Sequence, residues 1–518
     1  MENKLYYGDN LKIMRESIED ESVDLVYLDP PFNSSATYNI LFKDESGDFA
    51  PSQIKAFSDT WRWPDAVEEF DELRADAPEN VRRMIEGFYD FLGPCAMMAY
   101  LVMMSLRILE LRRVLKATGS LYLHCDPTAS HYLKILMDSV FDVKNFRNEI
   151  TWCYKERELS KRYWNKKHDV ILFYVKDCNK SYTFNWSTAT YEYSPGTFAK
   201  FQLTDEDGRK YQIRGKGGPY TGKHGLSSQV EKEHPEWIYR DYLDDKPGVL
   251  PRDWWIDIPF LNRAARERLG YPTQKPQVLL ERIIKASSNE GDVVLDPFCG
   301  CGTTIEAAEK LKRKWIGIDI THLSIQLVRK RIDEAFEGEC IYAVHGIPED
   351  YGSAKELAKQ DKYEFQWWAL SLVDARPFGG EDYKKKGRDR GIDGIYSFID
   401  DEKRKSKIAV ISVKGGTTGP VHVRELKGTV EREKAAIGIL ITLDPPTNEM
   451  KLEASTAGFY ESYLFKKKFP KIQIISVKEY FNDNLRAELP NFSGRSIAFK
   501  KAQKVVKEDG ENQNDLQL

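Results

Sequence analysis

The sequence predicts a two-domain α/β protein whose larger domain is built on a parallel β-sheet. Apolar, β-favouring runs alternate with amphipathic stretches, which is typical of a sheet with helices on both faces. Two of these runs end abruptly in an acidic residue, at Asp29 and at Asp296. The pattern changes near Gly346-Ile347-Pro348, where we expect a second domain to begin.

The composition indicates a soluble globular protein. The chain has 518 residues, of which 41% are hydrophobic and 31% charged, so two or three domains are expected. No apolar run is long enough to span a membrane, and the first residues do not resemble a signal peptide. Seven scattered cysteines form no disulfide framework, so we expect a reducing, cytoplasmic environment. The net charge of -4 means that any nucleic-acid contact depends on local basic patches.

The elements of the first domain are predicted from these patterns in chain order. We expect a short strand at 5–7, a helix over 11–18, a strand over 23–28, a loop or lid over 34–83, a long buried helix over 91–115 closed by a turn at 117–119, a strand over 120–126, a helix over 130–140 and a strand over 170–175. Further on we expect a helix over 277–288, strands over 292–296 and 315–318, and a helix over 323–336.

A long stretch with weak periodicity interrupts this domain between about 179 and 258. It contains many lysines and arginines and a run of aromatic residues: Tyr191, Tyr193, Tyr211, Tyr220, Trp237, Tyr239, Trp254 and Trp255. Aromatic and basic side chains together suit contacts with bases and phosphates. The same composition also occurs as solvated charge over a small core, and both readings stay open for individual residues.

The first candidate site is Asp29-Pro30-Pro31-Phe32, which follows the apolar run 23–28. Neither proline has a backbone N–H, and each restricts the residue before it. A carboxylate, rigid carbonyl groups and an aromatic ring are therefore held at the carboxyl end of a strand, where open α/β sheets bind ligands. The sequence Asp444-Pro445-Pro446-Thr447 lacks the aromatic residue and predicts only a turn.

The second candidate site is the glycine-rich turn 296–304, which includes Phe298, Gly300, Gly302 and Thr303. Glycines allow a tight turn and close approach to a ligand, and the following helix offers free N–H groups. The spacing differs from the dinucleotide fingerprint Gly-x-Gly-x-x-Gly, which favours a smaller ligand with a carboxylate. Asp319 ends the next strand, where an acid binds ribose hydroxyls. Cys299 and Cys301 have poor spacing for zinc, so we interpret them as small loop residues.

Together these motifs resemble the S-adenosylmethionine-dependent amino-methyltransferases of DNA. The catalytic motif precedes the cofactor motif with a variable region between them, as in the circularly permuted beta class. Residues 271–276, Tyr-Pro-Thr-Gln-Lys-Pro, resemble the segment that closes over the methionine end of the cofactor, and Lys167-His168-Asp169 resembles a late motif of the class. The likeness covers about residues 1–340. Phe32 stands where the family more often has Tyr.

The resemblance implies a circularly permuted Rossmann-like methyltransferase sheet at 1–346, with a target-recognition region at about 151–260. It implies that Asp29, Pro30, Pro31 and Phe32 are catalytic and that double-stranded DNA is the partner. The implied cofactor-binding residues are Asp9, Lys275, Asp296, Phe298, Gly300, Gly302, Thr303 and Asp319.

The chemistry of amine methylation agrees with these residues. Asp29 and the carbonyl of Pro30 can accept hydrogen bonds from an exocyclic amine, and Phe32 can stack on a base rotated out of the duplex. Aspartate before the two prolines usually accompanies adenine N6, and cytosine N4 stays open. A related family that methylates glutamine side chains of proteins places its cofactor motif first. The oligomeric state, including a homodimer, also stays open.

The second domain, predicted over 347–500 and followed by a disordered tail at 501–518, carries a separate motif. A helix is expected over 364–372, and strands are expected around 394–398 and 408–414. Asp393 at the start of one strand and Lys414 on the next resemble the Mrr-like branch of the PD-(D/E)xK restriction endonucleases, over about 355–480. The resemblance implies Mg²⁺ held by Asp393 and the Val413 carbonyl, with Lys414 activating water.

This second resemblance has two departures. Ser412 stands where the superfamily has Asp or Glu, and the helical acid has no clear match, because Glu364 and Gln366 both lie near its position. The alternatives are therefore an active, Mg²⁺-dependent endonuclease, which would make the chain a fused restriction–modification enzyme, and an inactive DNA-binding domain. Asp389 is interpreted as a solvated loop charge.

Overall fold

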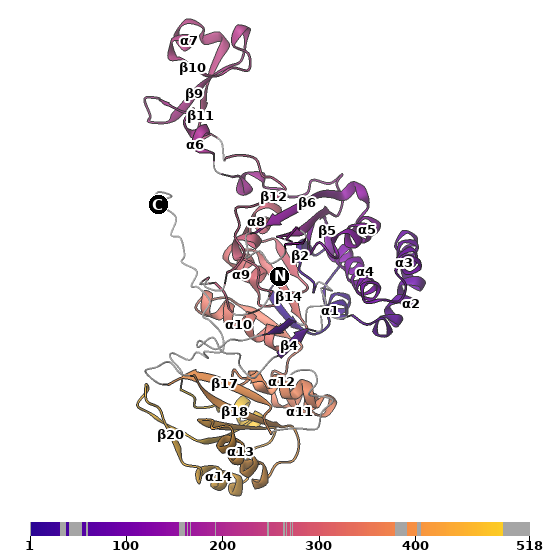
Figure 1. Ribbon diagram of the computed structural model, residues 1–518, viewed down its shortest axis with the longest axis vertical. Helices are drawn as coiled ribbons and strands as arrows, with labels where there is room; N and C mark the ends of the chain where they lie inside the picture. The colour runs from indigo at the N-terminus through magenta and orange to yellow at the C-terminus, as the bar shows by residue number, and fades with distance from the viewer. Residues whose placement is uncertain are drawn as a thin grey trace.

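The computed structural model describes most of the chain, in several stretches separated by gaps. The described residues are 2–31, 38–40, 54–57, 61–154, 161–162, 164–165, 167–191, 193–245, 248–262, 265, 267–269, 271, 273–378, 391–400 and 406–490. Phe32, Asp389 and the predicted tail lie outside them. A large sheet domain occupies the middle of the molecule, a small domain projects at one end, and the C-terminal domain lies at the other (Figure 1).

The larger domain is built on a nine-stranded sheet with the order β12-β6-β7-β5-β2-β13-β14-β1-β15. Its strands are β1 (Asn3–Tyr7), β2 (Val23–Leu28), β5 (Leu115–Cys125), β6 (Phe146–Cys153), β7 (His168–Val175), β12 (Trp254–Trp255), β13 (Val293–Asp296), β14 (Lys314–Asp319) and β15 (Tyr342–His345). The prediction of a parallel sheet is wrong at β7, which is antiparallel to both neighbours. No helix separates β6 from β7 among the described residues, as expected for a connection between antiparallel strands.

Helices cover both faces of this sheet. One face packs against α1 (Asn10–Ser17), α2 (Val67–Asp76), α3 (Glu79–Leu92), α4 (Ala96–Val114) and α5 (Ser130–Phe141), and the other against α8 (Gln277–Ser287), α9 (Thr303–Lys310) and α10 (His322–Ala335). Val26 and Leu28 belong to the first core, whereas Leu25 and Tyr27 belong to the second. This alternation explains why the run 23–28 is apolar throughout.

Two local predictions for this domain are wrong. The region 34–83, which is expected to be a loop or lid, contains α2 and the start of α3. The single helix expected over 91–115 is interrupted, because α3 ends at Leu92 and α4 begins at Ala96. The turn expected at 117–119 lies inside β5. A Cβ atom at Gly119 would lie 2.6 Å from Leu115 and 3.0 Å from the carbonyl oxygen of Asp24. The register shifts here, because Val23 pairs with Leu115 and Leu25 with Ser120. Gly119 therefore lies in an irregular part of β5, where its lack of a side chain allows close approach to β2.

The projecting domain is formed by the middle of the insert, between 193 and 245. It contains α6 (Pro195–Phe198), α7 (Ser228–Glu233) and a small antiparallel sheet of β8 (Leu203–Thr204), β9 (Lys210–Gly215), β10 (His224–Leu226) and β11 (Ile238–Tyr242) around a core of three buried side chains (Figure 1). Within the region expected at about 151–260, the end of β6, β7 and β12 belong to the main sheet. Separately, β3 (Tyr38–Ile40) and β4 (Ile54–Phe57) form a two-stranded antiparallel sheet.

The C-terminal domain has a five-stranded sheet of β16 (Arg376–Pro377), β17 (Gly394–Ile399), β18 (Ser406–Lys414), β19 (Ile437–Thr442) and β22 (Ile472–Ser476). Around it lie α11 (Tyr351–Gln360), α12 (Lys362–Ser371), α13 (Pro420–Arg432), α14 (Asn448–Ser455), α15 (Val477–Asn482) and a hairpin of β20 (Phe459–Glu461) and β21 (Lys468–Pro470). The expected pairing of β17 with β18 is present and antiparallel. No helix within the described ranges is long and apolar enough to cross a membrane.

Buried Arg107 on α4 connects this helix to the start of the chain. Its guanidinium donates to Asp9 and Asn10, each at 2.7 Å, and to the carbonyl of Met103 at 3.1 Å, and it lies 3.4 Å from Glu69 on α2. Only 8% of the Arg107 side chain is exposed. Hydrogen bonds to charged groups contribute about 1.5–3 kcal/mol each when they replace those of water. Arg107 therefore links α4 to α2 and to the start of α1.

We predict that Arg107→Met lowers the free energy of unfolding by about 2–3 kcal/mol, because several charged hydrogen bonds are lost while their partners stay in place. Urea unfolding followed by circular dichroism measures the effect. Arg15→Met is the matched control, because Arg15 is 40% exposed and pairs with Glu72 at the surface, where an ion pair is worth about 0–1 kcal/mol. Equal urea midpoints for the two variants would contradict this role of Arg107.

Candidate active site

The candidate site lies where the carboxyl ends of β2, β13, β14 and β1 meet. These strands are parallel neighbours, so the residues that end them emerge at the same edge of the sheet. Asp29 follows β2, Asp296 ends β13 and Asp319 ends β14, with Tyr7 of β1 opposite Asp319. The structure thus brings the two predicted motifs together.

The glycine-rich turn between β13 and α9 is folded onto these acids. The amide of Phe298 donates to Asp296 at 3.0 Å, and the amide of Gly300 donates to Asp319 at 3.0 Å. Gly300 and Gly302 have φ angles of +49° and +78°, in the left-handed region that favours glycine. A Cβ atom at Gly302 would lie 2.9 Å from Val328. Glycine is therefore required for the shape of this turn, which ends at Thr303, the first residue of α9.

Two of the acids at this edge have raised pKa values. Burial raises the pKa of Asp296 to about 7, against hydrogen bonds from Thr304 and Phe298 that lower it. Burial also raises the pKa of Asp319 to about 6, against hydrogen bonds from Thr321 and Gly300. Buried acids with raised pKa values are more frequent at functional sites than elsewhere, which supports the location of the site.

Asp29 forms an ion pair with Lys275. The Nζ atom of Lys275 lies 2.5 Å from Oδ2 of Asp29, and the two side chains are 11% and 16% exposed. The sequence places Lys275 at the cofactor, and in the structure it holds one oxygen of the candidate catalytic acid. Pro30 is buried and Pro31 is half-buried.

Asp9 lies at the same edge, beside Asp319. Gly8 donates its amide to the carbonyl of Asp319 at 3.0 Å, and Asp9 caps α1 by accepting from the amide of Lys12. The next residue, Asn10, donates to the carbonyl of Pro297 at 2.8 Å. The start of the chain and the glycine-rich turn are therefore directly bonded.

A buried polar chain that the sequence did not reveal lies next to Asp29. His124 is fully buried and lies 2.9 Å from the hydroxyl of Tyr27 and 3.0 Å from Asp169. Asp169 also accepts from the hydroxyl of Tyr154 at 3.1 Å. Although burial opposes it, the hydrogen bond from His124 keeps the pKa of Asp169 below its ordinary value. The available signal was Lys167-His168-Asp169, which resembles a family motif without indicating His124 as the partner.

Cys299 and Cys301 are both buried and have different neighbours. Cys299 packs near Gly317, whereas the thiol of Cys301 lies 3.7 Å from both Thr303 and Arg331. Burial raises the pKa of both thiols. These contacts agree with their interpretation as small residues of the loop.

The aromatic residues of the insert differ in exposure, and Tyr191, Tyr193, Tyr220 and Trp237 are half-buried. Tyr211 and Trp255 are 6% exposed and belong to hydrophobic cores. Tyr239 and Trp254 are 40% and 43% exposed, and the guanidinium of Arg252 lies 4.8 Å from the ring of Trp254. Tyr239 and Trp254 are thus the most accessible of these aromatic side chains.

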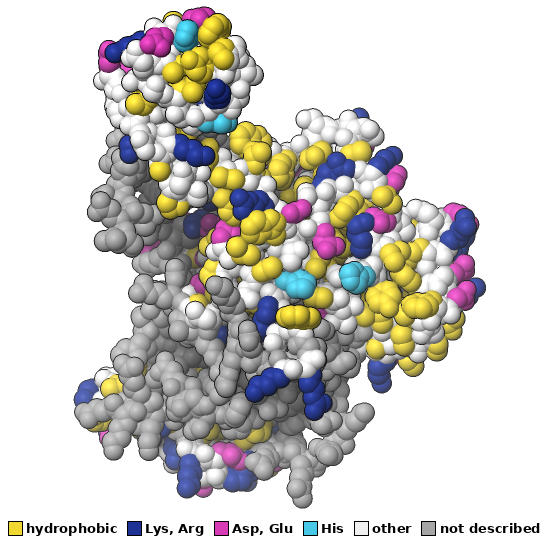
Figure 2. All heavy atoms as spheres, turned by 45° about the horizontal axis from the view of Figure 1, so that its top comes forward, with side chains coloured by type: hydrophobic (Ala, Val, Ile, Leu, Met, Phe, Trp, Pro, Cys, Tyr) yellow, Lys and Arg dark blue, Asp and Glu magenta, His cyan; other side chains and the backbone are white. Residues whose placement is uncertain are grey.

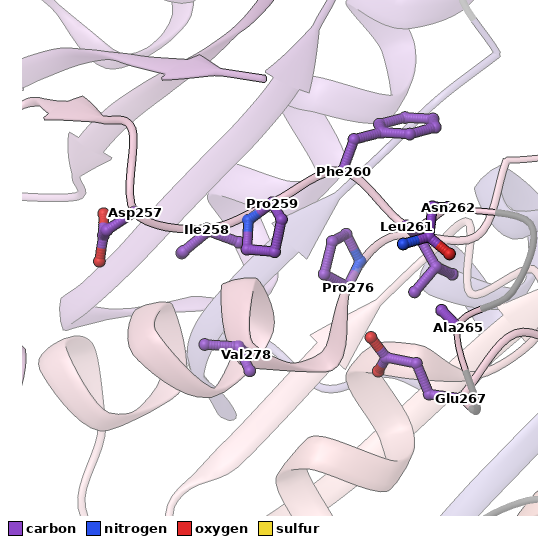
Figure 3. Close-up of a pocket in the computed structure, with 10 residues that line it drawn as sticks. All are labelled: Asp257, Ile258, Pro259, Phe260, Leu261, Asn262, Ala265, Glu267, Pro276 and Val278. Carbon is purple, nitrogen blue, oxygen red and sulfur yellow. The ribbon is translucent and has the colours of Figure 1, made fainter. Parts of the chain in front are cut away.

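A pocket borders the segment that presents Lys275. It is lined by Asp257, Ile258, Pro259, Phe260, Leu261, Asn262, Ala265, Glu267, Pro276 and Val278 (Figure 3). Glu267 accepts from the amide of Gln277 at 3.2 Å, and burial raises its pKa. Pro276 follows Lys275 directly in the chain, and the lining residues include neither Asp29 nor any residue of the glycine-rich turn.

In the C-terminal domain, Asp393 is 8% exposed and its carboxylate is held by the protein. Oδ2 of Asp393 accepts from the hydroxyl of Ser412 at 3.2 Å and from the amide of Val413 at 2.6 Å. Among the described residues, no group of three or more His, Cys, Asp or Glu side chains could hold a metal ion. Glu364 is engaged elsewhere, because its carboxylate accepts from the hydroxyl of Tyr7 in the first domain.

Comparison with known proteins matches the two domains to two different families. Residues 371–481 match the family described as NACHT-associated inactive Restriction Endonuclease 1, a description that does not support the expected Mg²⁺-dependent cleavage. Residues 23–330 match the N6_N4_Mtase family, described as DNA methylase. This match includes Asp29, the glycine-rich turn and Asp319.

The similar proteins include two bacterial enzymes and one solved structure. The chain is 27% identical to Type II methyltransferase M.EcaI of Enterobacter cloacae, over 64% of this chain and 69% of that protein. It is 30% identical to DNA adenine methyltransferase YhdJ of Escherichia coli K12, over 57% of this chain and 82% of that protein. A putative DNA modification methylase of Thermus thermophilus, complexed with S-adenosyl-L-methionine, aligns at 18% identity over 66% of this chain and 100% of that one, with a TM-score of 0.33.

Because the N6_N4_Mtase match spans more than half of the chain and contains both motifs, this protein belongs to the N6_N4 family of DNA methylases.

Proposed function

We propose that this protein is a site-specific DNA methyltransferase that moves a methyl group from S-adenosylmethionine to the exocyclic N6 of adenine. The observation that carries the proposal is the meeting of Asp29 with the glycine-rich turn at one edge of the sheet. The same arrangement supports a circularly permuted methyltransferase fold, because β2 precedes β13 in the chain and pairs with it in the sheet.

The residues of the turn fit S-adenosylmethionine. A Cβ atom at Gly300 would lie 3.3 Å from the ring of Tyr271, so glycine lets the backbone of this turn pack closely against Tyr271, beside the amide that it donates to Asp319. We assign Asp319 to the ribose hydroxyls, and we assign the turn, with Asp296 and Thr303, to the rest of the cofactor. When bound, this cofactor supplies an electrophilic methyl group on a sulfonium.

Asp29 and the Pro30 carbonyl prepare the amine for attack. As acceptors of its two hydrogen bonds, they direct the nitrogen lone pair toward the methyl group, and Asp29 is placed to receive the proton that the amine releases. Lys275 fixes one oxygen of Asp29 at 2.5 Å and leaves the other for the base. Most of the rate enhancement then comes from positioning. Phe32, which follows Pro31 in the chain, is assigned to stacking on the rotated base.

Adenine is the favoured base for two reasons. The motif begins with Asp29 rather than serine, and the similar protein YhdJ is named a DNA adenine methyltransferase. Cytosine N4 is the second candidate, because the family is described by both positions.

We assign contact with double-stranded DNA to the insert and the adjacent sheet edge. Figure 2 shows hydrophobic and basic side chains intermixed on this face of the molecule. The exposed members include Phe198, Tyr239 and Trp254, and Arg252 stacks on Trp254. Such pairs combine stacking with attraction to phosphate.

For the C-terminal domain we propose a restriction-endonuclease-like fold without cleavage activity. Of the acids that the restriction-endonuclease resemblance expects, only Asp393 is in place among the described residues. Ser412 stands where the superfamily has Asp or Glu, and the carboxylate of Glu364 accepts a hydrogen bond from Tyr7. A carboxylate already held by Ser412 and Val413 is a poor single anchor for Mg²⁺, which is usually bound through one or two carboxylates and substrate phosphates.

The central prediction is that Asp29→Ala lowers the turnover rate of DNA methylation about 100-fold or more, because the acceptor that orients the amine is lost. Transfer of labelled methyl groups to genomic DNA measures the rate. Asp444→Ala is the matched control, because Asp444 also precedes two prolines but lies in the exposed turn between β19 and α14. Equal rates for Asp29→Ala and the wild-type chain would overturn the assignment.

The raised pKa of Asp319 predicts that cofactor affinity depends on pH. The ionised carboxylate accepts from ribose hydroxyls, and this form predominates only above about pH 6. Affinity for S-adenosylmethionine should therefore be lost as the pH falls below 6, by about tenfold per unit for one linked proton. Calorimetric titrations between pH 5 and 8 test this, and Asp319→Asn should reduce the slope by about one proton. A flat profile for the wild-type chain would contradict it.

The C-terminal proposal predicts no Mg²⁺-dependent cutting. Supercoiled plasmid incubated with the wild-type chain and Mg²⁺ should be nicked no faster than with Lys414→Ala. Cutting that requires Mg²⁺ and disappears in Lys414→Ala, with methylation unchanged, would establish the endonuclease alternative instead.

A further inference from the structure

We propose that Glu364 of the C-terminal domain is a positioning residue of the cofactor site, and that docking of this domain and binding of S-adenosylmethionine strengthen each other. The inference rests on the proposed function for the cofactor only. It assigns the C-terminal domain a role in methylation that does not require cleavage of DNA.

The contact is made by helix α12, which lies against α10 of the larger domain. The carboxylate of Glu364 accepts a hydrogen bond from the hydroxyl of Tyr7 and lies 3.3 Å from Nε2 of His322. The rings of Tyr7 and His322 are stacked, with centroids 3.9 Å apart and planes inclined by 16°. Although burial opposes it, the proximity of His322 and the hydrogen bond from Tyr7 keep the pKa of Glu364 below its ordinary value. Glu364 therefore reaches this contact as a carboxylate.

Both partners of Glu364 are directly connected to Asp319. Tyr7 is paired with Asp319 in the β1–β14 ladder, and the next residue, Gly8, donates its amide to the Asp319 carbonyl at 3.0 Å. His322 follows Thr321, whose amide and hydroxyl both donate to the Asp319 carboxylate, at 2.9 and 3.0 Å. A shift of Glu364 therefore acts on Asp319 from two sides.

One turn further along α10, a second contact joins this helix to the last residue of α12 and to the segment that follows it. The side-chain amide of Gln326 donates to Asp374 at 2.7 Å and lies 3.4 Å from the carbonyl of Ser371. The interface is thus a row of polar contacts along α10 that begins at the cofactor edge. His322 is 7% exposed at the side chain, so undocking of α12 would expose a buried group next to Asp319.

This arrangement explains why Glu364 does not serve as the acid that the nuclease resemblance expects. Glu364 faces the methyltransferase domain, whereas its neighbour Phe365 packs under the end of β18, where a Cβ atom at Gly415 would lie 3.0 Å from the Phe365 ring. Adjacent residues of α12 therefore connect the cofactor edge to the strand that carries Lys414.

Because coupling between two binding equilibria is reciprocal, cofactor binding must stabilise the docked position of α12 if docking improves cofactor binding.

The test uses the full-length chain with S-adenosylmethionine and DNA. We expect Glu364→Ala and Tyr7→Phe to raise the KM and the calorimetric Kd for S-adenosylmethionine about 5- to 20-fold, within the usual range of such coupling. The turnover rate at saturating cofactor should stay near that of the wild-type chain. The double variant should be no worse than the weaker-binding single variant, because both remove the same bond.

Two matched controls separate this role from general damage. Tyr342→Phe removes a tyrosine–carboxylate bond of 3.1 Å, to Asp333, from the neighbouring strand β15, and Glu356→Ala removes an exposed acid of α11 that pairs with Lys359. Neither should change the KM for the cofactor. Hydrogen exchange of residues 362–371 should slow when S-adenosylmethionine binds to the wild-type chain and should not respond in Glu364→Ala.

Unchanged cofactor affinity in both Glu364→Ala and Tyr7→Phe, or exchange of α12 that ignores the cofactor, would overturn the inference while leaving methylation intact. A wild-type chain that binds no S-adenosylmethionine would overturn the proposed function and this inference with it.

Discussion

The parallel ladder between β2 and β13 is the constraint on which the site depends. Leu25 and Val26 pair with Val294 and Leu295, from parts of the chain separated by the whole insert. Because the strands are parallel, Asp29 and Asp296 emerge at the same edge. The bond from Asn10 to Pro297 and the ion pair of Asp29 with Lys275 then lock the two halves together. Chemistry that needs an acid beside a glycine-rich turn is possible only with this register.

Much of this edge could be predicted from local sequence. Asp29, Asp296 and Asp319 each end an apolar run, and an apolar run that stops at a charged residue is typical of a buried strand reaching the edge of its sheet. The glycine-rich turn was predictable for a similar reason, because Gly300 and Gly302 adopt backbone conformations that other residues rarely do. These signals depend on neighbours in the chain, so one sequence is enough to find them.

The partners across the fold could not be predicted, because they depend on packing between distant segments. The motif around Lys275 predicts a place at the cofactor, yet the length of this side chain lets it reach Asp29. Gly119 predicts a turn, although its lack of a side chain serves the approach of β2 and β5. His124 is a single histidine in an apolar run, and only the fold shows that it bridges Tyr27 and Asp169. The sequence cannot show that the partners of Glu364 lie in another domain.

The insert leaves and rejoins the sheet domain at neighbouring points. Asn185 bonds to backbone carbonyls at the end of α8, and β12 returns the chain to the free side of β6. Between these anchors, the isolated bridge of Tyr191 with Val249 closes the base of the projecting domain. Neither the length nor the shape of the projecting domain therefore enters the register of the main strands. The chain could lengthen or shorten between Tyr191 and Val249 without moving the edge that holds Asp29 and Asp319.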